Sequence, residues 1–450
     1  MILTENTDTL SSLTRNKKEA IALLSIGTFL EYFDLMLYVH MAVLLNELFF
    51  PTTDPETTSL LSAFAFCSTY LLRPFAGLIF GYIGDHIGRR STVIITTVMM
   101  SLSCLAMANL PTYAQIGITA SWLVTICRIV QGISSMGEIV GAGLYLTETI
   151  KPPARYPAVA MVVVASAFGG MVALFVASMV TSYSSNWRLV FLVGTCIALI
   201  GFMARLTLRE SAEYANAKER VKLTFANNNY QLEKLKNNSL WNEKIKTGTI
   251  VSYFIMESVS PVYFYLNYIY CGNLLKSNFH YTAEQVISHN LNLGVVNFIN
   301  AIILTILCYK FHPLKILKTK LYLFIPFIIS FPVLLDYVNT PFQLLTLQTF
   351  FIFLCCTAFP ANPIIFIQFP IFKRFTCTTL TFATSKALMY TAPAFGLTYI
   401  TKYFGNIGIL LILVPMNIAY ILARNYFENL EIEAGRLHMK KLNLPVAAFE

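Results

Sequence analysis

A charged, glycine-rich segment in the first quarter of the chain reads Gly81-Tyr82-Ile83-Gly84-Asp85-His86-Ile87-Gly88-Arg89-Arg90. The apolar run of residues 59–82, which overlaps the start of this segment, carries one charge, Arg73. The apolar run of residues 91–110, which follows the segment, carries none. Apolar runs of about 20 residues are long enough to cross a bilayer as a helix. Glycines allow a tight reversal and a close approach of helices, while charged side chains stay at the wet membrane boundary. We therefore expect this segment to be a compact loop between two membrane spans.

The whole chain of 450 residues has the composition of a membrane protein. Its residues are 56% hydrophobic and only 12% charged, whereas soluble proteins average about 25% charged residues. Further apolar runs follow along the sequence. They predict twelve transmembrane helices, at about residues 20–46, 59–82, 91–110, 118–146, 157–182, 187–207, 247–271, 286–309, 320–338, 342–367, 377–401 and 404–424. We therefore expect an all-α membrane protein.

Positive charges gather in alternate loops, which predicts the orientation of the chain, because cytoplasmic loops are enriched in lysine and arginine. Placing both termini in the cytoplasm leaves only Arg188, Lys276 and Lys402 on the outer side. The cytoplasmic side then receives Arg15, Lys17, Lys18, Arg89, Arg90, Lys151, Arg155, Lys310, Lys315, Lys318, Lys320, Lys373, Arg374, Arg424, Arg436, Lys440, Lys441 and the basic residues of 205–246. The net charge of +9 is therefore a topology signal, and we expect no nucleic-acid partner.

A long polar segment rich in Asn, Lys and Glu divides the twelve runs into two sets of six. We interpret it as a cytoplasmic linker between two six-helix bundles. The expected organisation is a cytoplasmic N-terminus (1–19), an N-terminal bundle (20–207), the linker (208–246), a C-terminal bundle (247–424) and a cytoplasmic tail (425–450). Where the charged segment would recur in the second half, residues 309–315 keep the basic charge but lack the aspartate and the glycines.

Two acidic residues lie inside the first apolar run, where a charge costs about 2.5 to 3.5 kcal/mol on insertion scales. Glu31, Asp34 and Tyr38 are spaced i, i+3 and i+7, so they share one helical face. Two acids so close in a dry site do not both remain ionised easily, and this chemistry suits a proton carrier. The alternative is that one or both pair with a buried arginine and hold helices together.

The fourth run carries a polar stripe. Arg128, Gln131, Ser135 and Glu138 are three, four and three residues apart, which places them along one face of a helix. Such a stripe on an apolar helix indicates a water-lined cavity or a buried charge network. Two roles are open for Arg128, the binding of a substrate carboxylate and a fixed salt bridge to an acid of the first run. Glu138, which has glycines nearby, is the better candidate for a proton site or a cation contact.

Three more charged residues lie inside apolar runs. Arg73 precedes Pro74 in the second run, where a helix kink with structural pairing competes with direct substrate contact. Glu257 lies in the seventh run and Lys386 in the eleventh. Either these two residues pair across the second bundle, or Glu257 faces the cavity.

Four pieces of this sequence together match a known pattern. They are Gly27-Thr28-Phe29-Leu30-Glu31-Tyr32-Phe33-Asp34 with Tyr38, Leu72-Arg73-Pro74-Phe75-Ala76-Gly77, the segment 81–90, and Arg128-x-x-Gln131-Gly132 with Gly137-Glu138, Gly141 and Tyr145-x-x-Glu148. They resemble the major facilitator superfamily, and within it the metabolite:proton symporters that include proline/glycine-betaine, citrate, shikimate and 2-oxoglutarate permeases. The sequence is most similar to the proline/betaine transporter type, over residues 20–210.

The resemblance implies two six-helix bundles around a central cavity that opens alternately to either side, with uptake driven by a proton gradient. It also implies a bacterial host and the cell inner membrane as the location. In that family the charged loop gates the inward side, so the implied conformational gate consists of Gly81, Gly84, Asp85, Gly88, Arg89, Arg90 and Glu148. The candidates for substrate binding and proton coupling are Glu31, Asp34, Arg73, Arg128, Gln131, Glu138, Glu257 and Lys386.

The leading hypothesis is a proton-coupled importer of a small polar metabolite such as proline, a betaine or an organic acid. The alternative is a transporter-derived membrane sensor or binding protein that no longer cycles. An enzyme is not expected, because the six histidines form no ligand cluster in the sequence and no nucleophile motif stands out. The expected partners are a small-molecule substrate, protons and the lipid bilayer. We expect a monomer, and no cofactor or metal.

Overall fold

The computed structural model describes residues 14–50, 70–183 and 243–437, together with single positions between 188 and 219. Within these residues every regular element is a helix. Eight candidate spans in the described residues are long and apolar enough to cross a membrane. The all-α prediction is therefore confirmed, whereas most of the predicted run 187–207 and of the linker 208–246 lies outside the described residues.

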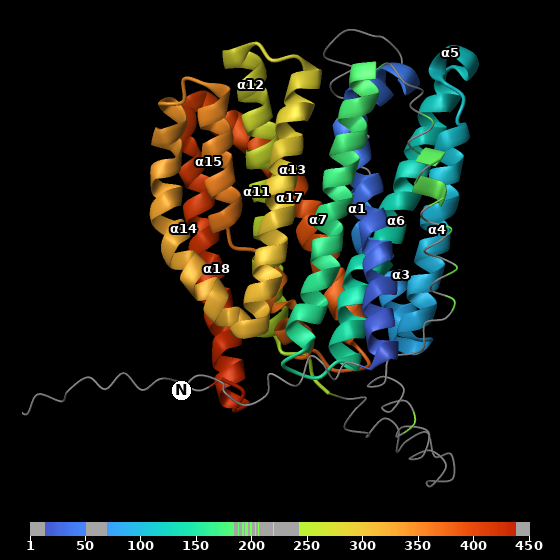
Figure 1. The fold of residues 1–450 in the computed structure, drawn as a ribbon. Helices are drawn as coiled ribbons and strands as arrows, with labels where there is room; N and C mark the ends of the chain where they lie inside the picture. The colour runs from blue at the N-terminus through green and yellow to red at the C-terminus, as the bar shows by residue number, and fades with distance from the viewer. Residues whose placement is uncertain are drawn as a thin grey trace, which may run out of the picture.

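The helices stand side by side in two groups, one from each half of the chain (Figure 1). Within the first group α1 packs on α7, and α4 packs on α6. A buried core there contains Phe33, Phe49 and Leu174. The elements of this group, drawn in blue to green, are α1 (Arg15–Phe49), α3 (Arg73–His86), α4 (Arg89–Asn109), α5 (Tyr113–Ile116), α6 (Ile118–Thr149) and α7 (Arg155–Tyr183).

The second group is held together by aromatic rings. The ring centroid of Phe351 lies 5.4 Å from those of Tyr263 and Phe324, edge to face, an arrangement that aromatic pairs prefer. The elements of this group, drawn in yellow to red, are α11 (Thr247–Phe264), the π-helical η2 (Tyr265–Tyr270), α12 (Cys271–Phe279), α13 (Ala283–Lys310), α14 (Pro313–Asp336), α15 (Pro341–Leu354), the 3-10 turn η3 (Phe359–Ala361), α16 (Asn362–Phe366), α17 (Arg374–Phe404), the 3-10 turn η4 (Gly405–Ile409) and α18 (Leu410–Glu433).

Local sequence signals set where several of these helices begin. The hydroxyl of Thr282 accepts a hydrogen bond from the backbone N–H of Gln285, whose side chain accepts one from the backbone N–H of Thr282. This reciprocal cap satisfies donors that the first turn of α13 leaves open. Thr340 and Gln343 repeat the arrangement at α15. Helix α14 begins at Pro313. Proline has no backbone N–H, and an N–H at the first position of a helix has no partner within that helix, so no hydrogen bond is lost there.

The charged segment 81–90 is mostly helical, which corrects the prediction of a loop. Helix α3 continues to His86 and α4 begins at Arg89, so only Ile87 and Gly88 connect them. Gly88 has a φ of 150°, a conformation that favours glycine. The turn is therefore made by one glycine, and the others in the segment serve another purpose.

The predicted tenth span, 342–367, is not one continuous helix. Helix α15 ends at Leu354, Cys355 has an extended ψ of 143°, and helical structure resumes only at η3 and α16. Cys355, Thr357, Ala358 and Phe359 of this break line a cavity between the helix groups.

The two groups meet along two helix pairs, α7 with α13 and α3 with α17. In the first pair, a Cβ added to Gly294 would lie 3.0 Å from a methyl of Leu174. In the second pair, a Cβ added to Gly81 would lie 2.6 Å from the Cα of Thr376, and one added to Gly84 would lie 2.6 Å from the ring of Phe375. Glycine at such positions lets membrane helices approach closely. Gly81 and Gly84 therefore serve the contact between the halves.

Candidate functional site

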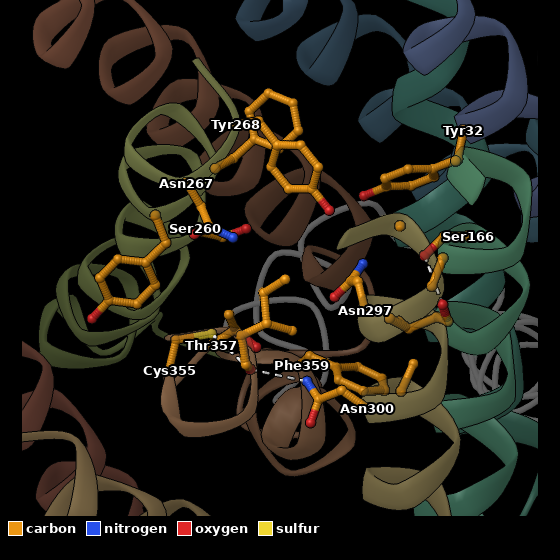
Figure 2. A pocket seen from close by; sticks show the side chains of 18 of the residues that line it. Tyr32, Ser166, Ser260, Asn267, Tyr268, Asn297, Asn300, Cys355, Thr357 and Phe359 are labelled. Carbon is orange, nitrogen blue, oxygen red and sulfur yellow. Dashed lines mark hydrogen bonds between the residues drawn. The ribbon is translucent and has the colours of Figure 1, made fainter. Parts of the chain in front are cut away.

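A cavity of about 270 Å³ lies between the two helix groups (Figure 2). Tyr32 of α1 and Ser166 of α7 reach it from the first group, and Tyr268 of η2 and Asn297 of α13 reach it from the second. Figure 2 shows the hydroxyls of Tyr32 and Tyr268 pointing toward each other across this space. Ligand pockets are typically concave and lined by aromatic groups with a few polar ones, at volumes from about 300 Å³. Further polar residues of the wall are Glu257, Ser260, Tyr263, Asn267, Asn300, Lys320, Thr357, Asn362, Lys386 and Tyr390.

Two charged residues in the cavity wall neutralise each other. The Nζ of Lys386 lies 2.9 Å from Oε2 of Glu257, and both side chains are buried. The same ammonium donates to the backbone carbonyl of Glu257 at 3.0 Å. That carbonyl lacks its usual helical partner because Pro261, four residues later, has no N–H. Pairing with Lys386 and a position at the cavity were alternative predictions for Glu257 from the sequence. In the structure both hold, since Glu257 pairs with Lys386 and also lines the cavity.

The π-helical turn η2 places Asn267 in the cavity wall. Gln348 of α15 donates from Nε2 to the backbone carbonyl of Asn267 at 2.5 Å, and its Oε1 lies 2.7 Å from Nε2 of His289. Asn267 is 2% exposed, and its side-chain amide makes no hydrogen bond to any described residue. Helical π-turns frequently occur at functional sites. Sequence reasoning missed Asn267, although an asparagine inside an apolar run was the signal that could have identified it.

A second polar cluster is buried inside the first helix group. Nη1 of Arg128 lies 3.6 Å from Oδ2 of Asp34 and donates to Oε1 of Gln131 at 2.7 Å. Gln131 donates in turn from Nε2 to Oδ1 of Asp34 at 3.0 Å, and Sγ of Cys104 lies 3.5 Å from the same oxygen. The structure therefore favours the salt-bridge alternative for Arg128, with Asp34 as its partner.

The other candidates of the first half lie at different places. Glu31 and Arg73 are both buried and line a small void beside the Asp34–Arg128 pair. The guanidinium of Arg73 lies 4.5 Å from the ring centroid of Tyr70, within the range of a cation–π contact. Residues 70 and 71 are helical, Leu72 is a turn residue, and α3 begins at Arg73 with Pro74 in its first turn, so the helical structure is interrupted next to this proline. Glu138 belongs to α6, in a stretch whose side chains lie outside the described part of the chain.

Asp85 caps a helix of the opposite half. Its Oδ1 accepts from the backbone N–H of Phe375 at 3.0 Å, and its Oδ2 accepts from that of Thr376 at 2.8 Å. These N–H groups belong to the first turn of α17, where helices leave donors open and favour negative charge. Burial raises the pKa of Asp85, while Arg89 and the two N–H groups oppose that shift. The contact joins the first half to the second.

A buried ion-pair cluster continues this contact. Arg89 pairs with Asp85 at 3.0 Å and with Glu148 at 3.1 Å, and Glu148 also pairs with Arg374 at 3.3 Å. Arg89 donates further to the carbonyls of Gly84 and Ile371. We call Asp85, Arg89, Glu148 and Arg374 the inner ion-pair cluster. Arg374 was expected only as a cytoplasmic loop charge, because its partner lies 226 residues earlier in the chain.

Arg90 points away from this cluster, since it is exposed and donates to the carbonyl of Leu206 at 2.8 Å. At the other end of α3, about 20 Å away by helix rise, a ring contact joins the two halves. The ring of Tyr70 stacks on that of Tyr390 of α17 with centroids 4.2 Å apart. The cavity therefore has contacts between the two groups on both of its sides.

An all-helical fold with apolar spans and a polar cavity between two helix groups defines a membrane protein of the transporter class. The family model of the Major Facilitator Superfamily matches residues 24–370. The chain belongs to this family. Because the family consists of membrane transporters, the chain is a multi-pass membrane protein and not an enzyme.

Curated relatives match over a shorter length. The chain is 32% identical over 222 residues to the inner membrane metabolite transport protein YhjE of Escherichia coli. The aligned stretch covers 47% of this chain and 50% of that protein. It is 31% identical over 208 residues to the proline/betaine transporter of Salmonella typhimurium. This aligned stretch covers 44% of this chain and 41% of that protein. The chain thus spans about half the length of the curated relatives it matches.

A solved structure resembles the fold over nearly its full length. The proton:xylose symporter XylE aligns with a TM-score of 0.72 at 16% identity, covering 92% of this chain and 95% of that chain. This likeness supports the helical architecture.

Proposed function

We propose that the protein imports a small polar metabolite together with protons across the cell inner membrane by alternating access. The cavity between the helix groups is the transport site in this proposal. The names of the relatives suggest proline, betaines and other small metabolites as candidates. The proposed partners are the solute, protons and the bilayer, with a monomer as the working unit and no nucleic acid.

The topology proposed with this function has twelve spans, both termini in the cytoplasm and two six-helix bundles at residues 20–207 and 247–424. The eight candidate spans and the family membership support it. The linker 208–246 would then connect the bundles on the cytoplasmic side, with residues 1–19 and 425–450 as the cytoplasmic ends.

The Asp34–Arg128 pair is the observation that supports proton coupling most directly. Asp34 is 2% exposed, and its carboxylate is held by Arg128 and Gln131 inside the bundle. Protonation of Asp34 would remove its negative charge and release Arg128, because a buried charge requires a partner. A proton at this site thereby changes how α1 and α6 are held together. We assign Glu31 and Arg73 supporting roles in the same proton site, because both line the void beside the pair, and we keep Glu138 as a candidate for proton coupling.

The inner ion-pair cluster is the proposed gate on the cytoplasmic side. Asp85 holds the first turn of α17, and Gly81 and Gly84 let that helix lie close. Release of the solute into the cell requires these contacts to separate. Gly88 makes the turn that positions Arg89, and Arg90 anchors the outer surface of the same turn.

Uptake by purified protein in proteoliposomes tests this function. Labelled proline, glycine betaine and organic acids are supplied outside, with and without an inside-alkaline pH gradient. We expect accumulation that depends on the gradient in the wild type, and exchange without accumulation in Asp34→Asn. Asp336→Asn, which changes an aspartate at the exposed end of α14, serves as the control and should accumulate normally.

Uptake that ignores the gradient, or that Asp34→Asn leaves unchanged, would contradict proton coupling at this site. Binding of a solute without exchange across the bilayer would instead favour a sensor that no longer cycles.

A further inference from the structure

The cavity wall also narrows the chemistry of the solute. Resting on the proposed transport function, we propose that the cavity selects a neutral, hydroxyl-rich solute of the sugar or polyol class, and that Asn267 contacts it directly. Two independent observations lead to this inference. One is the distribution of charge in the wall, and the other is a buried amide that has no protein partner.

The charges in the wall leave little for a charged solute to bind. The described wall residues that carry charge are Glu257, Lys320 and Lys386. Lys386 directs two contacts at Glu257, one to the carboxylate and one to the backbone carbonyl, and its Nζ lies 4.9 Å from the ring centroid of Phe382. Two of the three donors of this ammonium are thereby engaged by Glu257. Separating a buried ion pair is strongly unfavourable because it leaves both charges without partners.

Lys320 is the remaining charge in this wall. Its side chain is partly exposed, as expected for a lysine that buries its stem and keeps its ammonium in water. It therefore offers an anion a hydrated surface contact and not a desolvated pocket.

The side-chain amide of Asn267 is buried without a protein partner in the described part of the chain. The residue is 2% exposed, and neither Nδ2 nor Oδ1 has a hydrogen-bond partner among the described residues. An amide presents donors on one side and an acceptor on the other. A carboxylate only accepts and an ammonium only donates, so either group alone would leave one atom of Asn267 unsatisfied. A hydroxyl both donates and accepts, and a pair of neighbouring hydroxyls satisfies both atoms at once.

The surroundings of Asn267 fit the same class of solute. Figure 2 shows its amide directed toward the space that Tyr32 and Tyr268 border with their hydroxyls. Asn297 and Asn300 of α13 add two more amides to the wall, and Asn300 already donates to the carbonyl of Ile352 at 3.2 Å. Neutral groups that hydrogen-bond in both directions, alternating with aromatic faces, match a solute with a carbon ring or chain covered in hydroxyls.

Ligand binding to the full-length protein in detergent tests this inference. Thermal shifts are measured with pentoses, hexoses, sorbitol and myo-inositol, with proline and glycine betaine, and with gluconate and succinate. A bound ligand stabilises the folded protein by mass action. We expect at least one neutral polyhydroxylated compound to raise the melting temperature more than any zwitterion or acid, and the same compound to exchange across proteoliposomes.

The variant Asn267→Leu separates recognition from structure. Because it replaces an unsatisfied amide by an apolar group of similar size, the empty variant should be as stable as the wild type or more stable. Its affinity for the neutral solute should fall about tenfold or more, since both hydrogen bonds are lost. Asn292→Leu, an exposed asparagine on α13 that does not line the cavity, is the matched control and should bind normally.

Several results would overturn the inference. Preference for betaine, proline, succinate or gluconate would refute the neutral class while leaving the transport function intact. Unchanged affinity in Asn267→Leu would exclude the assigned contact, and a large loss of stability in the empty variant would point to a structural role. Absence of exchange for every class of solute would instead refute the transport function on which the inference rests.

Discussion

Replacing Asp85 by asparagine should open the cytoplasmic gate, because this carboxylate holds the first turn of α17 from the opposite half. It accepts hydrogen bonds from two backbone N–H groups, at 3.0 and 2.8 Å, and pairs with Arg89 at 3.0 Å. Asparagine keeps one acceptor oxygen and turns an N–H₂ group toward a donor. Hydrogen bonds to a charged group contribute about 1.5 to 3 kcal/mol each. Loss of one such bond, which crosses between the halves, should weaken the closed arrangement by about 2 kcal/mol, roughly thirtyfold in the equilibrium.

Spin-label distances measure this shift. Labels at Lys151, between α6 and α7, and at Lys318, in the second turn of α14, occupy exposed positions on the two halves. In a background without native cysteines, we expect one main distance for the wild type and a longer population for Asp85→Asn. The control is His86→Asn, which changes the exposed neighbour. Identical distance distributions in Asp85→Asn and the wild type would refute the assigned role of the cap.

Three further predictions concern packing, pH and the buried ion pair. Gly81→Val should block closure and uptake, since its Cβ would lie 2.6 Å from a backbone atom, whereas Gly272→Ala, with 3.4 Å to Val286, should be tolerated in the same uptake assay. Burial lowers the pKa of His312, which neighbours Lys315, Glu431 and Arg436, from 6.5 to about 4. The folded state then binds fewer protons at this histidine than the unfolded state does. The free energy of unfolding should therefore fall as the pH drops from 6.5 to 4, by at most about 3 kcal/mol. Melting curves of His312→Asn should show a smaller loss over the same pH range. Glu257→Gln should lower the free energy of unfolding by about 3 kcal/mol, measured by thermal unfolding, and the double variant Glu257→Gln with Lys386→Met should lower it less. A loss in the double variant equal to the sum of the losses in the two single variants would contradict the pairing.

The sequence predicted the helical class and most spans because apolar length and loop charge are local properties. It also placed Asp34 and Arg128 on polar faces that meet in the structure. The partners of Asp85 were not predictable in this way. That residue was expected in a loop, yet it caps a helix that begins 289 residues later, and only tertiary packing brings the two together.

The cavity was the least predictable part of the site. Its polar wall comes largely from asparagine and tyrosine of the second half, which carry no charge signal and match no motif. The presentation of Asn267 depends on the π-helical turn η2, and the second contact of Lys386 depends on the carbonyl that Pro261 leaves open. Both features arise from backbone geometry, which periodicity of side chains does not report.

Proton movement driven by the solute itself tests the central claim most directly. Proteoliposomes contain a pH-sensitive dye, start without a pH gradient, and have their membrane potential clamped. The solute with the largest thermal shift is then added outside. The account predicts acidification of the lumen by wild-type protein and none by Asp34→Asn. Entry of the labelled solute into wild-type vesicles without any acidification would contradict proton-coupled uptake.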